Sequence, residues 1–177
     1  PNTTNVIYGR DVGYSVEKIS FDKDVESISA TKIRKSMNIS PVENEVSIAE
    51  RNKRNNHVGG VLWLTGLSAS GKTTIASKVE RKLFDKGYNI YMLDGDNLRD
   101  GLNSNLGFSD QDRNENIRRA SEVANILAES GFIVIASFIT PTKQDREIAK
   151  SNNKTKFYEV YISASIKKCE ERDKKDY

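Results

Sequence analysis

From Val58 onward, short apolar runs alternate with longer segments in which apolar residues recur at the spacing of a helical face. The runs 61–64, 89–93 and 132–138 predict buried strands, and the run 157–162 predicts a fourth strand, because each is short and rich in β-branched, aromatic or leucine residues. Strands that alternate with helices in this way are typical of a parallel sheet with helices on both faces. The pattern therefore predicts an α/β fold, a three-layer sandwich with a mostly parallel sheet.

Helices are expected between these strands. Ile75, Val79 and Leu83 have helical spacing, and Gly87 is a suitable residue to end the helix that they define. Pro141 prevents the strand before it from continuing. The remaining helices are expected from Asp110 to a stop at Gly131, over residues 144–150, and from Ser165 onward.

Composition narrows the function classes. The chain has 28 Lys and Arg against 25 Asp and Glu, a net charge of +3 that gives no reason to expect a nucleic acid partner. No apolar run approaches the ~20 residues that cross a bilayer, and no leader sequence is visible. The single cysteine, Cys169, excludes an internal disulfide and any multi-cysteine metal site. We therefore expect a cytoplasmic enzyme with neither a nucleic acid nor a membrane partner.

The run Gly66–Thr73 matches the phosphate-loop pattern G-x-x-x-x-G-K-[ST] in full, between a predicted strand and a predicted helix. Its glycines allow backbone N–H groups to surround phosphates at the positive end of the helix. Lys72 is expected to reach the β- and γ-phosphates of ATP, and the Thr73 hydroxyl to ligate Mg²⁺. The fold is therefore expected to be of the P-loop NTPase type. The loop residues expected to bind ATP are Gly66, Ser68, Ala69, Ser70, Gly71, Lys72, Thr73 and Thr74.

A phosphate loop indicates a nucleotide user but leaves the acceptor open. The N-K-x-D motif by which GTPases read guanine is not found, since residues 152–155 lack the aspartate. No predicted strand ends in the apolar run followed by Asp-Glu that many motor ATPases carry. Phosphoryl transfer to a small molecule is favoured.

Asp94 and Asp96 stand at the end of the second predicted strand, the edge at which open α/β sheets bind their ligands. One carboxylate of such a pair can orient or deprotonate an acceptor hydroxyl while the other holds Mg²⁺. This predicts an acceptor site beside the phosphate loop, with Lys72, Asp94 and Asp96 as its catalytic residues.

Arginines follow this strand. Arg99 and Arg113 can bind phosphate or sulfate oxygens through two parallel hydrogen bonds. Arg113, Asn116 and Arg119 are three residues apart on one predicted helix, so a single anion is expected to meet more than one of them. Phe108 is placed to stack on a purine ring. A solvated helix face is the alternative for each arginine.

Residues 63–74, 93–99 and 106–119 resemble the adenylylsulfate kinases in motif order and spacing. The resemblance continues in 136–141 and 169–173, and it covers Asn52 to Asp173. It implies that ATP and adenylylsulfate (adenosine 5′-phosphosulfate) give ADP and 3′-phosphoadenylylsulfate, the activated sulfate donor. It also implies ATP and Mg²⁺ as cofactors, a role in sulfate assimilation, and a homodimer.

The same resemblance implies roles for individual residues. Thr73 and Asp94 would hold the metal, and Arg172 would contact the nucleotide. Thr140 stands where many relatives carry a serine sometimes described as phosphoryl-carrying, although direct transfer from ATP needs no such intermediate. Relatives continue into a lid, to which Lys175 corresponds, whereas Asp176 replaces its usual glycine and the remainder is missing, so the lid is expected to be truncated. The implied substrate-binding residues are Asp94, Asp96, Asn97, Arg99, Phe108, Arg113, Asn116, Ile139, Thr140 and Lys175.

Residues 1–40 do not follow the alternating pattern. The run Ile28–Arg34 resembles the I-S-x-T-x-I-R signature of nucleotidyltransferases, but the H-x-G-H motif of that family is missing. We expect a remnant of an upstream transferase domain, within a multifunctional protein, with a plain N-terminal arm as the alternative. Residues 41–57 are then expected to be a linker and residues 58–177 the kinase domain.

Two other functions stay open at this stage. The chain could be another P-loop small-molecule or nucleoside kinase, or a nucleotide-binding module without turnover. Turnover with different acceptors distinguishes these three possibilities.

Overall fold

The computed structural model describes residues 44–173, and the described residues from Val46 onward belong to one compact unit. The expectations for residues 1–40, for Lys175 and for the lid lie outside the described residues. None of the helices in the described range is both long and apolar enough to cross a membrane.

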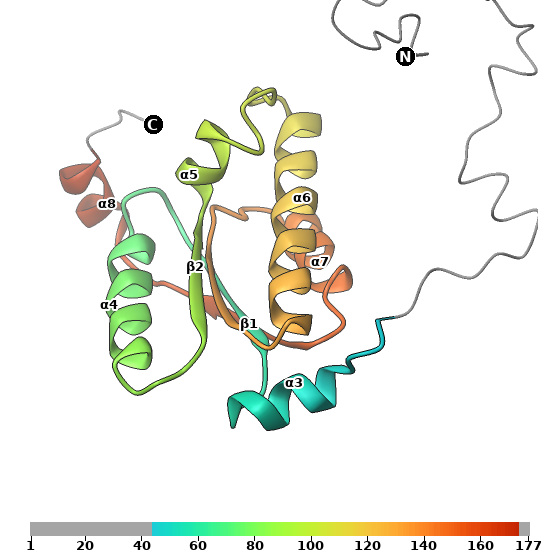
Figure 1. The fold of residues 1–177 in the computed structure, drawn as a ribbon. Coiled ribbons are helices and arrows are strands. Elements are labelled where there is room, and N and C mark those ends of the chain that lie inside the picture. Colours follow the sequence, from blue (N-terminus) through green and yellow to red (C-terminus); the bar gives the residue numbers. More distant parts are fainter. Residues whose placement is uncertain (1–43, 174–177) are drawn as a thin grey trace, which may run out of the picture. The chain divides into compact units, whose positions relative to one another are not determined.

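One parallel sheet in the order β2-β3-β1-β4 lies at the centre of the unit (Figure 1). Parallel neighbours need long crossover connections, and here helices supply them. The four predicted strands are confirmed with small shifts at their ends. They are β1 (Gly60–Thr65), β2 (Ile90–Asp94), β3 (Ile133–Ser137) and β4 (Lys156–Tyr161).

Helices cover both faces of this sheet. Helix α4 packs against β2 and β3 on one face, whereas α6 lies over β1 and β3 on the other face with α7 beside it (Figure 1). The predicted three-layer α/β sandwich is confirmed. The helices are α3 (Ile48–Asn55), α4 (Lys72–Phe84), α5 (Gly95–Asp100), α6 (Asp110–Glu129), α7 (Lys143–Ser151) and α8 (Ile166–Arg172).

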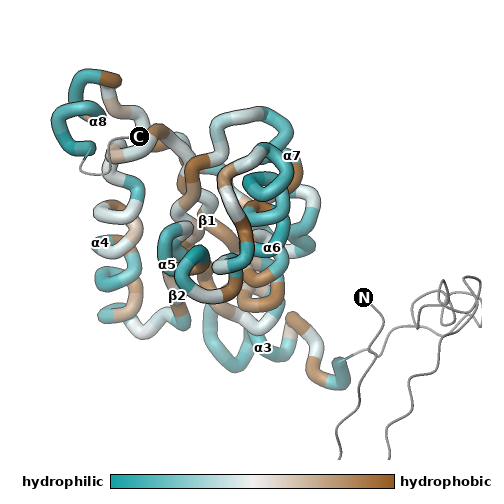
Figure 2. Tube along the Cα trace, turned by 90° about the horizontal axis from the view of Figure 1, so that it is seen from above, coloured by the Kyte–Doolittle hydropathy of each residue, from teal (hydrophilic) through white to brown (hydrophobic). Residues whose placement is uncertain are grey.

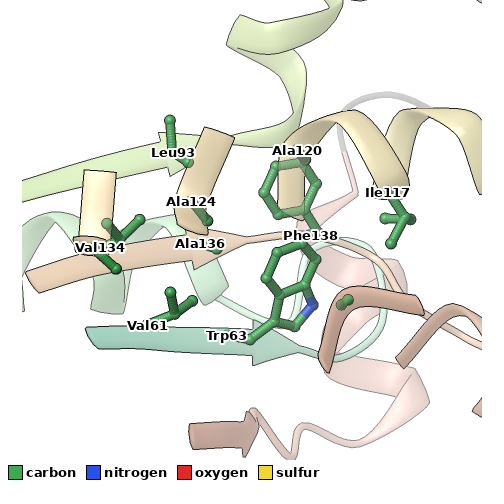
Figure 3. Close-up of a cluster of buried hydrophobic side chains, with 11 residues drawn as sticks. Val61, Trp63, Leu93, Ile117, Ala120, Ala124, Val134, Ala136 and Phe138 are labelled. Carbon is green, nitrogen blue, oxygen red and sulfur yellow. The ribbon is translucent and has the colours of Figure 1, made fainter. Parts of the chain in front are cut away.

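Each face of the sheet has its own apolar core. On the α6 side the ring of Trp63 stacks on that of Phe138, with 4.9 Å between the ring centroids (Figure 3). Ala120 and Ala124 face these rings from α6, and their small side chains allow the helix to pack closely on the sheet. Figure 2 shows the apolar positions concentrated along the strands and the hydrophilic ones on the helices around them.

The opposite core lies under α4. Leu64, Ile90 and Ile135 from three strands meet Ala76 of α4 there. Both cores hold β1 and β3 between two covered faces. The carboxyl ends of these central strands are therefore a rigid base for the loops that follow them.

Two helices were not predicted. Helix α3 lies within the expected linker, where Ser47 and Glu50 form a capping box. The Asn55 side chain donates to the Gly131 carbonyl (3.2 Å), and the Asn52 side chain accepts from the Gly59 N–H (3.1 Å), so α3 is joined to the sheet unit. Its short polar sequence has no apolar face that periodicity could detect. The domain boundaries themselves stay predictions.

Helix α5 follows β2 without a connecting loop. Asp94 is its N-cap, and the Asp94 Oδ1 accepts from the Asp96 N–H at 3.0 Å. Similarly, the N-cap of α6 is Ser109, one residue before the expected Asp110. The stop of α6 at Gly131 is confirmed, with φ +94° at that residue.

Candidate functional site

The loop between β1 and α4 has the backbone conformation that a phosphate cradle requires. Gly66, Ala69 and Gly71 all have positive φ, at 150°, 55° and 97°. A Cβ on Gly66 would lie 2.7 Å from the Ile162 carbonyl oxygen, so the first glycine of the motif is also required sterically. Helix α4 begins at Lys72, and its first N–H groups therefore open into the loop.

Lys72 extends back over this loop. Its Nζ donates to the carbonyl oxygens of Gly66 (3.0 Å) and Leu67 (2.7 Å), and the residue is buried. Burial lowers the pKa of Lys72 from its usual value, whereas nearby Cys169, Asp94 and Asp96 act in the opposite direction. The two carboxylates therefore favour the charged ammonium beside the loop.

Oxygen atoms from three elements meet next to Lys72. The Thr73 hydroxyl donates to the Asp94 Oδ2 at 2.9 Å and lies 3.4 Å from the Ser137 hydroxyl. The sheet register causes this meeting, because Asp94 at the end of β2 is paired with Ser137 at the end of β3.

These oxygens fit Mg²⁺, which prefers hard oxygen ligands. It commonly keeps several waters and takes only one or two protein ligands beside substrate phosphates. A cluster of three or more His, Cys, Asp or Glu side chains is accordingly not needed, and none occurs in residues 44–173. Thr73 and Asp94 are the residues that would hold the metal.

A cavity of about 610 Å³ opens at the carboxyl ends of the strands. It joins the phosphate loop to the segment after β2, as the sequence predicted for an acceptor site. Its volume suits a ligand of nucleotide size. The predicted site residues that line it are Ser68, Ala69, Lys72, Thr73, Asp94, Asp96, Arg99, Phe108, Arg113, Asn116, Ile139 and Arg172.

A second hollow of about 510 Å³ is lined by the phosphate loop and the start of α4. Ser70, Gly71 and Thr74 line it, and Lys72, Thr73 and Arg172 line both hollows. Both hollows therefore meet at the phosphate loop and share Lys72.

Two predicted arginines hold the edge of the first cavity. The Arg99 guanidinium lies 4.4 Å from the centre of the Phe108 ring, and its Nη1 donates to the Gly107 carbonyl at 3.0 Å. The Arg113 Nε donates to the Phe108 carbonyl at 2.9 Å. Both side chains therefore fix the loop that carries the exposed Phe108 ring.

Arg119 does not join this group. Its guanidinium binds Glu115 (2.8 Å), the Leu102 carbonyl and the Asn105 side chain. Arg118 binds Glu115 as well. Arg119 therefore anchors the turn before α6 and does not line the cavity. Arg113 and Asn116 both line it, so the expectation that one anion meets more than one of the three residues stays a prediction for that pair.

Three other predicted residues lie away from both hollows. Gly66 and Asn97 line neither of them. Thr140 is 1% exposed, and its hydroxyl donates to the Thr65 Oγ1 at 2.7 Å. A phosphoryl-carrying role for Thr140 therefore gains no support.

Several lining residues were missed from the sequence. Ser137 ends β3 as Asp94 ends β2, so the strand-end argument could have found it. Asp145 lines the cavity while its Oδ2 accepts from the Thr142 hydroxyl (2.7 Å) in the capping box of α7. The others, found only by packing, are Leu67, Gly95, Ile117, Phe138, Pro141 and Asp173.

Glu115 predicts a pH dependence of stability. Hydrogen bonds from Arg118 and then Arg119 lower its pKa from 4.5 to about 2. A carboxyl whose folded pKa is depressed stabilises the fold above its unfolded pKa and loses that contribution as pH falls through its folded pKa. We expect wild type to exceed Glu115→Gln in free energy of unfolding at pH 7, and the difference to shrink between about pH 4.5 and pH 2.

Urea unfolding at several pH values measures this difference. Glu129→Gln on the same helix is the control, since Glu129 has no ion pair with another residue in the described range. A Glu115→Gln difference that is independent of pH would contradict the assignment.

The fold and the site together define a class of protein. A parallel sheet carries a phosphate loop after β1 and a carboxylate, Asp94, at the end of β2. A cavity at the carboxyl ends of the strands is lined by both. These are the features of a P-loop phosphotransferase.

The chain belongs to the adenylylsulphate kinase family, whose sequence model matches residues 58–177. An adenylyl-sulfate kinase of Clostridium acetobutylicum is 51% identical over 142 residues, which are 80% of this chain and 71% of that protein. A solved APS kinase of Mycobacterium tuberculosis, in complex with AMPPNP and APS, is 47% identical with a TM-score of 0.64, over 67% of this chain and 70% of that one. A hexameric APS kinase of Thiobacillus denitrificans has a TM-score of 0.56 at 25% identity, over 85% of this chain and 31% of that one.

Proposed function

We propose that this chain transfers the γ-phosphate of ATP to the 3′-hydroxyl of adenosine 5′-phosphosulfate and so forms 3′-phosphoadenylylsulfate. The observation that carries the proposal is the single cavity in which the phosphate-loop lysine, the Thr73–Asp94 pair and an arginine-edged acceptor wall meet. Membership of the family and a relative solved with APS and AMPPNP support the choice of substrates.

On the nucleotide side, the loop residues 66–73 surround the ATP phosphates with backbone N–H groups. The Lys72 ammonium, already placed against the loop, follows the charge that develops on the transferred phosphoryl group. Bound Mg²⁺ would neutralise phosphate charge. Thr73 and Asp94 orient it from one side of the loop.

On the acceptor side, the Phe108 ring stacks on the adenine ring. Arg99 lies over the Phe108 ring, but the residue is still 58% exposed and can take this contact. The Arg113 Nη groups make no hydrogen bond within the described residues, and with Asn116 they bind the phosphosulfate. Asp94 and Asp96 lie beside the 3′-hydroxyl, and one of the two carboxylates orients it and accepts its proton as the oxygen bonds to the γ-phosphorus. A homodimer stays a prediction, although an assembled relative exists.

A coupled assay of ADP release with the full chain tests this function. We expect turnover with adenosine 5′-phosphosulfate and Mg²⁺, and at most trace turnover with AMP or adenosine. AMP lacks the sulfate, so its negative charge is confined to one phosphate group instead of being spread over a phosphate and a sulfate that Arg113 and Asn116 can both meet.

Two other results would decide against the proposal. Turnover with AMP or adenosine but not with adenosine 5′-phosphosulfate would indicate another small-molecule kinase. Tight binding of both nucleotides in calorimetry, without ADP release, would indicate a nucleotide-binding module.

A further inference from the structure

A fully buried asparagine stands behind the acceptor wall. Asn103 is 0% exposed in the turn between α5 and α6, and it does not line the cavity. We propose that Asn103 is a positioning residue: it holds the Asn116 side chain so that the amide N–H groups of Asn116, and not its oxygen, face the acceptor anion. The identity of this anion as a phosphosulfate rests on the proposed function.

The contact between the two side chains carries the inference. The Asn103 Nδ2 donates to the Asn116 Oδ1 at 2.9 Å, and Asn116 lines the cavity while it is only 6% exposed. The Asn116 Nδ2 makes no hydrogen bond within the described residues. Because the oxygen and nitrogen of an amide lie on opposite sides of its carbon, fixing the oxygen on Asn103 leaves the N–H groups for the cavity.

Asn103 itself is held by its backbone. Its N–H donates to the Leu98 carbonyl (2.8 Å), and its carbonyl accepts from the Leu106 N–H (3.0 Å). The residue therefore links α5, which begins beside Asp94, to the loop before Phe108. Its position is set by the same turn that shapes the acceptor wall.

Packing alone does not account for an asparagine here. The Asn103 Oδ1 is buried and has no hydrogen-bond partner among the described residues. A buried acceptor without a partner costs free energy, and an apolar side chain of similar size would avoid that cost. The function of this asparagine is therefore better explained by the hydrogen bond that its Nδ2 donates to Asn116.

The orientation of the Asn116 amide decides whether its interaction with an anion is attractive or repulsive. An Asn116 side chain turned by 180° would place a carbonyl oxygen against an anion, and the attraction would become repulsion. Among the described residues, the hydrogen bond that fixes the Asn116 oxygen comes from Asn103, whereas the Arg113 Nε is bound to the Phe108 carbonyl. The neutral Asn103 thus decides whether the Asn116 side chain adds to the attraction between Arg113 and an anion or opposes it.

The first test is the kinetics of Asn103→Ala in the full chain. We expect its KM for adenosine 5′-phosphosulfate to rise about tenfold, the size of one lost hydrogen bond to a charged group, with the KM for ATP unchanged. The matched control is Asn125→Ala. It removes a different buried asparagine, on α6, whose Oδ1 accepts from the Lys154 N–H at 2.8 Å. An equal rise in both variants would overturn the proposal.

A double-mutant cycle separates positioning from a general loss of structure. With Asn116→Ala as background, Asn103→Ala should raise the KM for the acceptor no further, since its effect passes through Asn116. Independent, multiplying effects of the two substitutions would contradict the inference.

A second measurement uses only the wild-type chain, so it does not depend on whether a variant folds. Hydrogen exchange followed by NMR in the free wild-type chain should show slow exchange for the Asn103 side-chain amide and fast exchange for that of Asn116. The reverse pattern would overturn the proposed orientation. Addition of adenosine 5′-phosphosulfate should then slow the Asn116 amide. If the free pattern is as expected and the acceptor changes nothing, the proposed function fails while the orientation stands.

Discussion

Lys72→Ala is expected to lower kcat for phosphoryl transfer by about a thousandfold, the upper range for loss of one preorganised charge-stabilising donor. The Lys72 ammonium lies against the loop carbonyls and beside Asp94, and it lines both ligand hollows. It can therefore follow the phosphoryl group from donor to acceptor. Steady-state ADP release, with ATP binding measured by calorimetry, checks the result.

Lys78→Ala is the matched control for this substitution. Lys78 lies on the same helix, is exposed, and lines neither hollow. Its removal changes the net charge by the same amount without touching the site. A loss of less than tenfold in kcat for Lys72→Ala would show that the ammonium serves the loop structure rather than the transfer.

Asp94→Asn is also expected to lower the rate of phosphoryl transfer strongly. We expect kcat to fall by about 10²- to 10⁴-fold, because an amide neither takes a proton nor attracts Mg²⁺ as a carboxylate does. The fold should remain intact, since asparagine caps a helix as well as aspartate: its Oδ1 can still accept from the Asp96 N–H, and its Nδ2 can donate to the Thr73 hydroxyl in place of the bond that the carboxylate accepted. The Mg²⁺ concentration at half-maximal rate should rise as well.

Asp100→Asn is the control for the Asp94 variant. Asp100 is the exposed last residue of α5 and lies outside the cavity, so its loss removes the same charge a few residues away. Thermal unfolding of both variants verifies that they are folded. Unchanged Mg²⁺ dependence in Asp94→Asn would remove Asp94 from the metal site, and an unchanged kcat would remove it from the reaction.

The sequence could predict elements whose cause is local. The apolar runs identified the strands. In the central strands β1 and β3 burial on both faces requires consecutive apolar residues, whereas β4 at the sheet edge has no buried residue. Helix α4 and the loop before it were equally clear. In contrast, α3 and α5 were missed, since caps at Ser47 and Asp94 and contacts such as Asn55 with Gly131 stabilise them more than any periodicity.

The arginines show the limit of periodicity. Arg113 and Arg119 share a helix at spacings that allow a common face, yet the structure gives them different partners. Arg113 binds the backbone of the cavity loop, whereas Arg119 binds Glu115 and the turn at Leu102. Helical spacing gives the direction of a side chain along its own helix, but the neighbour that it meets depends on how the turn of residues 101–107 folds back.

The sequence by itself therefore determined the nucleotide cradle, because every atom of the phosphate loop comes from eight consecutive residues, 66–73, and the backbone conformations of its glycines are local. The sequence marked residues of the acceptor side, but only the tertiary structure decided how they are assembled and which contacts hold them. Only the strand order β2-β3-β1-β4 brings Asp94 next to Ser137 and within reach of Thr73. Only the packing of the α5–α6 turn places the buried Asn103 against Asn116. Contacts between residues distant along the chain depend on the free energy of the whole fold, which no local pattern contains.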